Sequence, residues 1–109
     1  MTYNENLAQR VRHSMKAVRG AVEKNMFGGI GFLIHGNMAC GVNKQDLIVR
    51  LSEDEFKKAL KHPHVRVFNM TGRPMKGWIM VSAGGYASEA ALKGWIDKSV
   101  AQARTLPPK

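Results

Sequence analysis

The residues of this sequence that could bind a charged ligand are basic, and they fall into three groups. The chain has 109 residues, with 17 Lys and Arg against 8 Asp and Glu, which gives a formal charge of +9. If the groups converge in the fold, they would form a surface that attracts anions. Solvated cations on exposed helices are the simpler alternative, since no nucleic-acid recognition motif accompanies the charge. The groups are Arg12, Lys16 and Arg19; then Lys57, Lys58 and Lys61; then Arg73 and Lys76.

The third group has the most specific setting. Arg73 and Lys76 lie on a predicted loop between Gly72 and Gly77. A guanidinium held near an ammonium group could bind a phosphate or a carboxylate through charge-assisted hydrogen bonds. The same two side chains could equally form ion pairs with other residues of the chain and so stabilise the domain. Both interpretations stay open at this stage.

Metal and thiol chemistry are not indicated. His62 and His64 form one H-x-H pair, whereas a structural zinc site needs four ligands with a recognisable spacing. Cys40 alternates with Met38 and Val42 in a predicted strand, so we expect a buried, unreactive thiol. A single cysteine also excludes an internal disulfide. We therefore expect no metal site and no catalytic cysteine.

Nucleotide-binding motifs are also incomplete. Gly72 and Gly77 have the glycine spacing of a phosphate-binding loop, but Trp78 and Ile79 stand where that loop needs lysine and a hydroxyl. The acidic residues show no pair suited to acid–base catalysis. We expect no catalytic residue and no cofactor, so the protein is predicted not to be an enzyme.

Hydrophobic periodicity predicts the elements that carry these residues. A first helix begins near Leu7 and ends near Gly20, with apolar residues at spacings of three and four. Short strands joined by tight turns follow over residues 23–51, then a helix capped by Ser52 and stopped by Pro63. Further strands lead to a last helix capped by Ser88. The order predicts a single α+β domain over 1–109, with a mostly antiparallel sheet of five to six short strands and helices at the N-terminus, middle and C-terminus, covering one face.

Three short motifs carry a family resemblance. They run over residues 24–29, 36–42 and 71–78, and their order and spacing resemble the TfoX (Sxy) N-terminal domain family. Physically the motif residues look architectural: the glycines allow tight turns or close strand packing, Gly36 and Asn37 suit a hairpin turn, and the large apolar residues suit a core. The motif residues are Met26, Phe27, Gly28, Gly29, Gly36, Asn37, Met38, Gly41, Gly72, Pro74, Gly77 and Trp78.

The resemblance implies a compact bacterial α+β domain associated with the regulation of natural competence. Longer family members carry a second, C-terminal domain, for which 109 residues leave no room, so we expect a single-domain member. The leading hypothesis is a non-enzymatic regulatory module that binds a protein partner, with a homodimer as one form. The alternatives are a direct nucleic-acid-binding protein that uses the basic surface, and a small protein or enzyme that binds an anionic ligand.

The expected compartment rests on two segments that we do not find in the sequence, a signal peptide and a membrane-spanning stretch. The first 19 residues mix charged and polar side chains and lack the continuous apolar core of a signal peptide. No stretch approaches the roughly 20 apolar residues that span a bilayer. With one unpaired cysteine, we expect a cytoplasmic protein that does not bind membranes.

Overall fold

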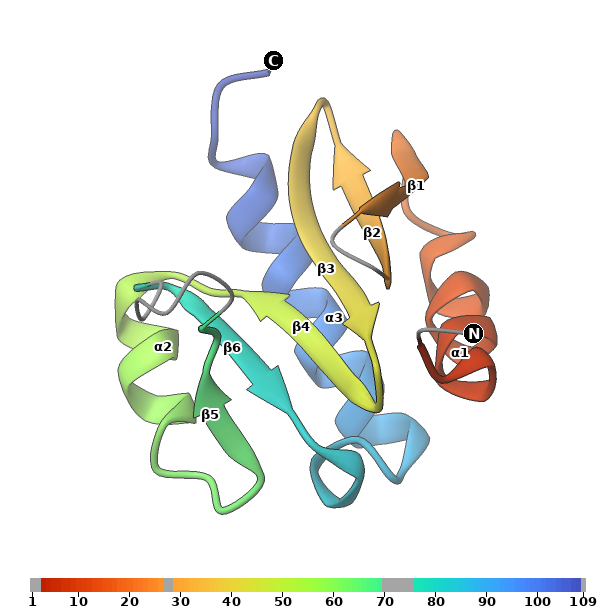
Figure 1. Ribbon diagram of the computed structural model, residues 1–109. Coiled ribbons are helices and arrows are strands. Elements are labelled where there is room, and N and C mark those ends of the chain that lie inside the picture. Colours follow the sequence, from red (N-terminus) through yellow and green to blue (C-terminus); the bar gives the residue numbers. More distant parts are fainter. Residues whose placement is uncertain (1–2, 27–28, 70–75, 109) are drawn as a thin grey trace.

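The described residues form three α-helices and one six-stranded sheet, with a short 3₁₀ turn at Ala83–Gly85 (Figure 1). The computed structural model describes residues 3–26, 29–69 and 76–108, and for Met26 the backbone alone. The elements in chain order are α1 (Glu5–Met15), β1 (Ala21–Met26), β2 (Gly29–Ile34), β3 (Asn37–Asn43), β4 (Asp46–Arg50), α2 (Glu53–Ala59), β5 (Val65–Val67), β6 (Trp78–Val81) and α3 (Glu89–Arg104).

The sheet confirms the predicted fold class. Its strand order is β1-β2-β3-β4-β6-β5, and every neighbouring pair is antiparallel. The first four strands form a meander in chain order. The last two are exchanged in space, so that β6 lies between β4 and β5.

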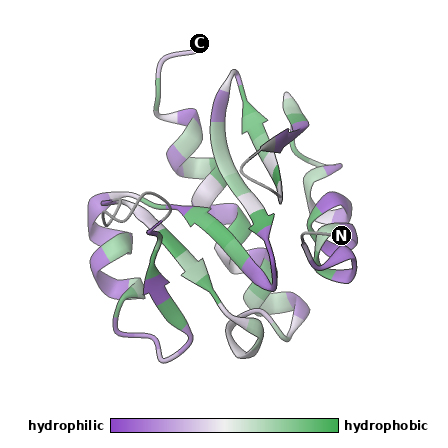
Figure 2. Ribbon diagram, viewed as in Figure 1, coloured by the Kyte–Doolittle hydropathy of each residue, from purple (hydrophilic) through white to green (hydrophobic). Residues whose placement is uncertain are grey.

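All three helices pack on one face of the sheet. Apolar residues of α1 and α3, such as Leu7, Val11 and Leu92, are fully buried together with Leu47 and Ile79 of the strands. Figure 2 shows the corresponding pattern, with hydrophobic colour along the central strands and hydrophilic colour on much of the helices. The opposite face, which we call the outer face, carries no helix in the described part of the chain. None of the described helices is long and apolar enough to cross a membrane.

Side-chain caps start the helices as the sequence predicts. The Ser52 hydroxyl accepts a hydrogen bond from the Glu55 amide at 3.3 Å, and the Ser88 hydroxyl accepts one from the Ala91 amide at 3.0 Å. Each satisfies one of the amide donors that the first helical turn leaves open. The Glu55 carboxylate does not reach back to complete the predicted capping box. It binds Lys58 and Lys98 instead.

Two local predictions were wrong by a few residues. The first helix ends at Met15 rather than near Gly20, because the chain turns over residues 16–20 and enters β1 with Gly20 at φ +82°. The turn between β2 and β3 consists of His35 and Gly36, both with positive φ, rather than of Gly36 and Asn37. Asn37 already belongs to β3, and its side-chain amide donates to the Pro107 carbonyl oxygen at 2.9 Å.

Candidate interaction surfaces

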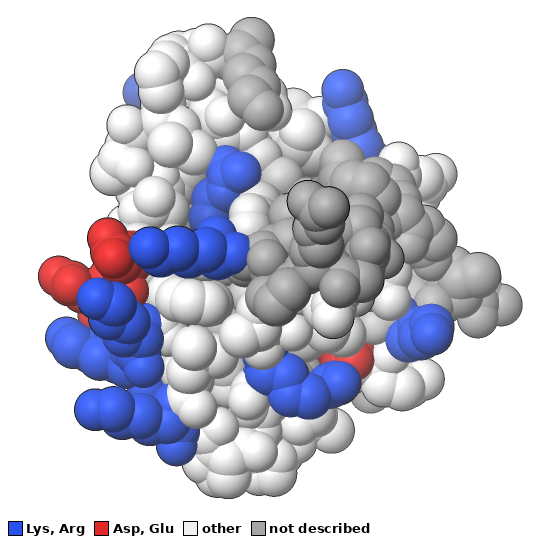
Figure 3. Space-filling model, turned by 60° about the vertical axis from the view of Figure 1, so that its left-hand side comes forward, with Lys and Arg blue, Asp and Glu red and all other residues white. Residues whose placement is uncertain are grey.

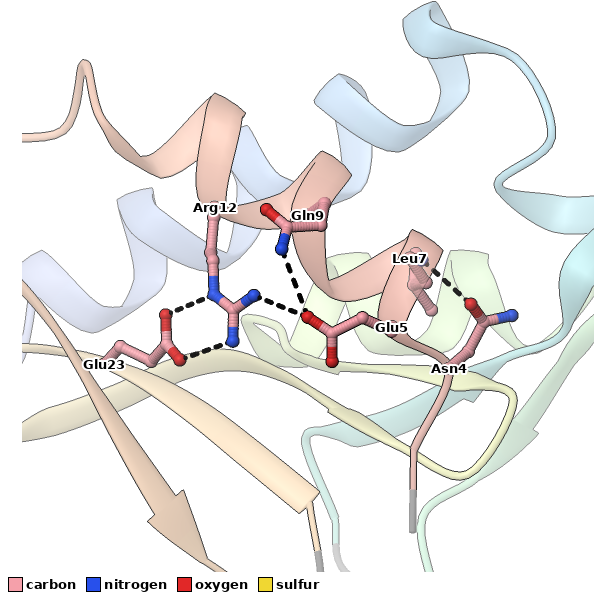
Figure 4. A network of polar contacts seen from close by, with 6 residues as sticks. All are labelled: Asn4, Glu5, Leu7, Gln9, Arg12 and Glu23. Carbon is pink, nitrogen blue, oxygen red and sulfur yellow. Dashed lines mark hydrogen bonds and ion pairs between the residues drawn. The ribbon is translucent and has the colours of Figure 1, made fainter. Parts of the chain in front are cut away.

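Arg12 is held between two carboxylates of the same chain (Figure 4). Its Nε and Nη2 donate to the two oxygens of Glu23 at 2.7 and 2.9 Å, and its Nη1 donates to Glu5 Oε1 at 2.9 Å. These bonds stabilise both charged forms, so they raise the pKa of Arg12 and lower the pKa of Glu23. The guanidinium therefore links α1 to β1 rather than offering a free charge to a ligand.

The other two members of the first group differ from Arg12. Lys16 and Arg19 are exposed, and neither has a carboxylate partner among the described residues. Arg104, at the end of α3, donates from Nη2 to the Arg19 carbonyl oxygen at 3.3 Å. We call Lys16, Arg19 and Arg104 the basic corner. It lies where the chain leaves α1 and enters β1, next to the C-terminal end of α3.

The second and third groups meet at α2. Glu53 Oε1 lies 3.6 Å from Lys57 Nζ and 3.4 Å from Lys76 Nζ, so one carboxylate brings the two lysines together. Lys76 is the main cause of the lowered pKa of Glu53. Lys58 lies 3.8 Å from Glu55, and Lys61 has no carboxylate partner in the described part of the chain. Figure 3 shows this side of the molecule, where the few acidic side chains each lie against basic ones.

Several of the predicted motif residues lie outside the described residues. They are Phe27, Gly28, Gly72, Arg73 and Pro74. Arg73 is therefore not placed relative to Lys76.

The described motif glycines occupy crowded or left-handed positions. A Cβ on Gly29 would collide with the Val42 carbonyl oxygen, and a Cβ on Gly41 would lie 2.5 Å from the Ile30 carbonyl oxygen. Gly77 has φ +88° and accepts a hydrogen bond from the Leu51 amide at 2.7 Å. These glycines shape the strands and their turns.

The feature that sequence reasoning missed is the contact of Arg50 with Trp78. The two residues face each other across β4 and β6, and the Arg50 guanidinium carbon lies 4.4 Å from the centre of the Trp78 ring. Both side chains are half-buried. Trp78 was expected in the core, but it lies on the outer face because Ile79 and Val81 occupy the alternate, helix-facing positions.

Arg50 has no anionic partner among the described residues. Its Nη1 is buried and has no hydrogen-bond acceptor among the residues that the structure describes. Burial also lowers the pKa of Arg50, because the low-polarity surroundings disfavour the charged form. The guanidinium is therefore stacked on an aromatic ring and partly removed from water, and no carboxylate in the described part of the chain neutralises its charge.

The surroundings of Arg50 on the outer face are largely apolar. Ile48 is buried next to the half-buried Met80, and the Phe68 and Trp78 ring centres are 6.5 Å apart. Arg66 follows Met80 in the same row across the sheet and donates to Asp46 at 3.0 Å. We call Arg50, Trp78, Ile48, Met80 and Phe68 the Arg50 patch.

The two histidines, His62 and His64, make contacts within the fold. The His64 amide donates to His62 Nδ1 at 3.1 Å, which uses one of the ring nitrogens. The His62 ring packs edge-on to Trp95, with ring centres 5.8 Å apart. Among the described residues there is no group of three or more His, Cys, Asp or Glu placed to hold a metal ion.

Comparison with known proteins agrees with the motifs and the fold. A search of curated proteins gave no significant match. The family model described as the TfoX N-terminal domain matches residues 7–103, from the first buried leucine of α1 to the last buried alanine of α3. The chain belongs to the TfoX N-terminal domain family.

Proposed function

We propose that this protein is a non-enzymatic regulatory module of the competence-regulator type, which acts in the cytoplasm by binding a protein partner through its outer face. The observation that carries the proposal is the Arg50 patch. It combines a stacked guanidinium without an anionic partner in the described chain with the half-buried Trp78 and Met80 side chains on the helix-free side of the sheet. Family membership supports the regulatory role.

The composition of this patch favours protein binding. Aromatic residues, Met and Arg are enriched at the centre of protein interfaces, and Lys and acidic residues are depleted there. Hot-spot residues are most often Trp, Tyr and Arg. The Arg50 patch has this composition, whereas three of the lysines near α2, which are Lys57, Lys58 and Lys76, are paired with Glu53 or Glu55.

Site-specific photo-crosslinking in cells tests this function. A photoreactive amino acid replaces Met80 on the outer face, and a matched variant carries it at Gln9, which is exposed on α1. We expect a discrete protein adduct from position 80 and none from position 9. An adduct with a second copy of this chain would identify a homodimer as the partner complex. No adduct from position 80, or the same adducts from both positions, would contradict the proposal.

The basic corner favours nucleic-acid binding as a second candidate function. Lys16, Arg19 and Arg104 lack carboxylate partners among the described residues, and the whole chain has a charge of +9. Phosphate contacts of this kind make binding strongly salt-dependent. Fluorescence anisotropy with single-stranded and duplex DNA would show affinity at low salt, and replacing the three residues with Gln would flatten the salt dependence. No affinity at low salt would exclude this candidate.

A further inference from the structure

We propose that the Arg50 patch binds an acidic–apolar segment of the partner protein, in which one Asp or Glu carboxylate pairs with Arg50 and its apolar neighbours pack on Trp78 and Met80. This inference rests on the proposed function and names the chemistry of the partner at that site. Its first support is the state of Arg50 itself, which is half-buried and has no anionic partner among the described residues.

The rest of the described chain supplies no carboxylate to Arg50. Seven of the eight acidic residues pair with other Lys or Arg residues. Three other arginines, Arg10, Arg12 and Arg66, each bind an acidic side chain at 3.0 Å or less. Of the arginines that the structure describes, Arg50 is the half-buried one that lacks this partner. A carboxylate from another molecule would neutralise the charge of this half-buried guanidinium.

Stacking on the Trp78 ring orients the Arg50 guanidinium for such a contact. Stacking at 4.4 Å restricts where the guanidinium plane can lie. A fixed guanidinium loses less conformational freedom on binding, and its fork of donors matches the two oxygens of a carboxylate. The partial burial of Arg50 strengthens the attraction, since charges interact more strongly away from water.

The neighbours of Arg50 favour a peptide over a nucleic acid. Protein–DNA interfaces are more polar and more positively charged than protein–protein interfaces. Around Arg50 the outer face instead carries the half-buried Trp78 and Met80, with Ile48 and Phe68 buried beside them, and Arg66 is already paired with Asp46. An acidic residue flanked by apolar residues complements both the charge and the apolar rim.

Selection from a random-peptide library displayed on phage tests the inference with the full chain as bait. We expect the enriched peptides to contain Asp or Glu between apolar residues. A synthetic copy of an enriched peptide should shift the NMR signals of the Trp78 indole N–H and the Arg50 Nε–H. Replacing its acidic residue with the matching amide should weaken binding about tenfold or more, since a charged hydrogen-bonded pair is lost.

Variants of the protein provide the controls. Arg50→Met should weaken binding of the acidic peptide about tenfold or more, and Arg50→Lys, which keeps the charge but loses the fork, should fall in between. Arg66→Met, at an arginine already paired with Asp46, should leave the affinity within about twofold, because a partner peptide gains little from it. Amide signals of the core would show that each variant is folded.

The outcomes separate this inference from the proposed function. Enriched peptides that bind the outer face equally well with and without their acidic residue would overturn the inference and leave the interaction module standing. If the Arg50 and Trp78 signals respond to a thymidine oligonucleotide and not to any peptide, the ligand of this face is a nucleic acid, and both the inference and the proposed protein partner are contradicted. Photo-crosslinking from position 80 that yields no protein adduct would instead contradict the proposed function itself.

Discussion

Arg12 of α1 and Glu23 of β1 are joined by two parallel hydrogen bonds, of 2.7 and 2.9 Å. This geometry is the strongest form of pairing between an arginine and a carboxylate. It fixes the first helix to the edge strand of the sheet, with Glu5 holding the same guanidinium from the other side. A residue that the spacing placed in a ligand-binding stripe therefore has a structural role.

Removing the Arg12 guanidinium should destabilise the domain in a pH-dependent way. Since pairing lowers the folded pKa of Glu23 below its ordinary value of 4.5, the pair stabilises the fold above that pH. Its contribution is lost as the pH falls through the folded pKa. The pair is partly exposed, so we expect Arg12→Met to lower the free energy of unfolding by about 1 kcal/mol at neutral pH. Urea unfolding at a series of pH values measures this.

Lys16→Met is the matched control for that experiment. Lys16 lies one helical turn further on and has no carboxylate partner among the described residues, so we expect a change within about 0.5 kcal/mol. An equal loss in the free energy of unfolding of Arg12→Met at neutral and at strongly acid pH would show that the stabilisation does not come from the charge of Glu23.

Gly41→Ala should be strongly destabilising. The added methyl group would lie 2.5 Å from the Ile30 carbonyl oxygen and 2.8 Å from the Met38 methyl group. Met38 can move, but the carbonyl belongs to the neighbouring strand, so the β2–β3 pairing has to shift. We expect a loss of about 2 kcal/mol or more in the free energy of unfolding, as for other overpacked sites. Chemical denaturation measures it, and an unchanged stability would show that the strands are further apart than the structure has them.

Gly94→Ala should have the opposite effect. Gly94 lies inside α3, and a methyl group there would meet nothing within 4 Å. Alanine lowers the conformational entropy of the unfolded chain and favours the helix, so we expect a gain of about 1 kcal/mol. Thermal unfolding would show a higher midpoint. A lower midpoint would contradict this prediction, because it would mean that the added methyl group meets a contact at position 94.

The fold was predictable because its signals are local. The apolar spacing of Leu7, Val11 and Met15 indicates a helical stripe, and the alternation of Leu47, Val49 and Leu51 indicates a strand. Ser52 and Ser88 mark where helices begin. Each of these features depends on residues a few positions apart, so the sequence alone contains enough information to place them.

The Arg50 patch was not predictable in the same way. Arg50 and Trp78 meet because β6 is inserted between β4 and β5, so a later strand lies next to an earlier one. Periodicity shows which face of its own strand a residue occupies, but it does not show which strand is the neighbour. The same limit explains why Arg12 was grouped with Lys16 and Arg19. Its carboxylate partner Glu23 lies on a separate strand, and the spacing along a helix does not reveal it.

Cys40 should be unreactive in the folded protein and reactive once the protein unfolds. Its side chain is fully buried, and burial raises the pKa of the thiol to about 12, although a hydrogen bond with Ser99 acts in the opposite direction. Alkylation requires the thiolate, which an exposed cysteine with a pKa near 8.5 forms readily at mildly alkaline pH. We expect labelling by iodoacetamide at pH 8 to be slow without denaturant and to reach the rate of a free thiol above the urea midpoint, as followed by mass spectrometry. Labelling of the native protein at the unfolded rate would show that β3 opens readily to solvent.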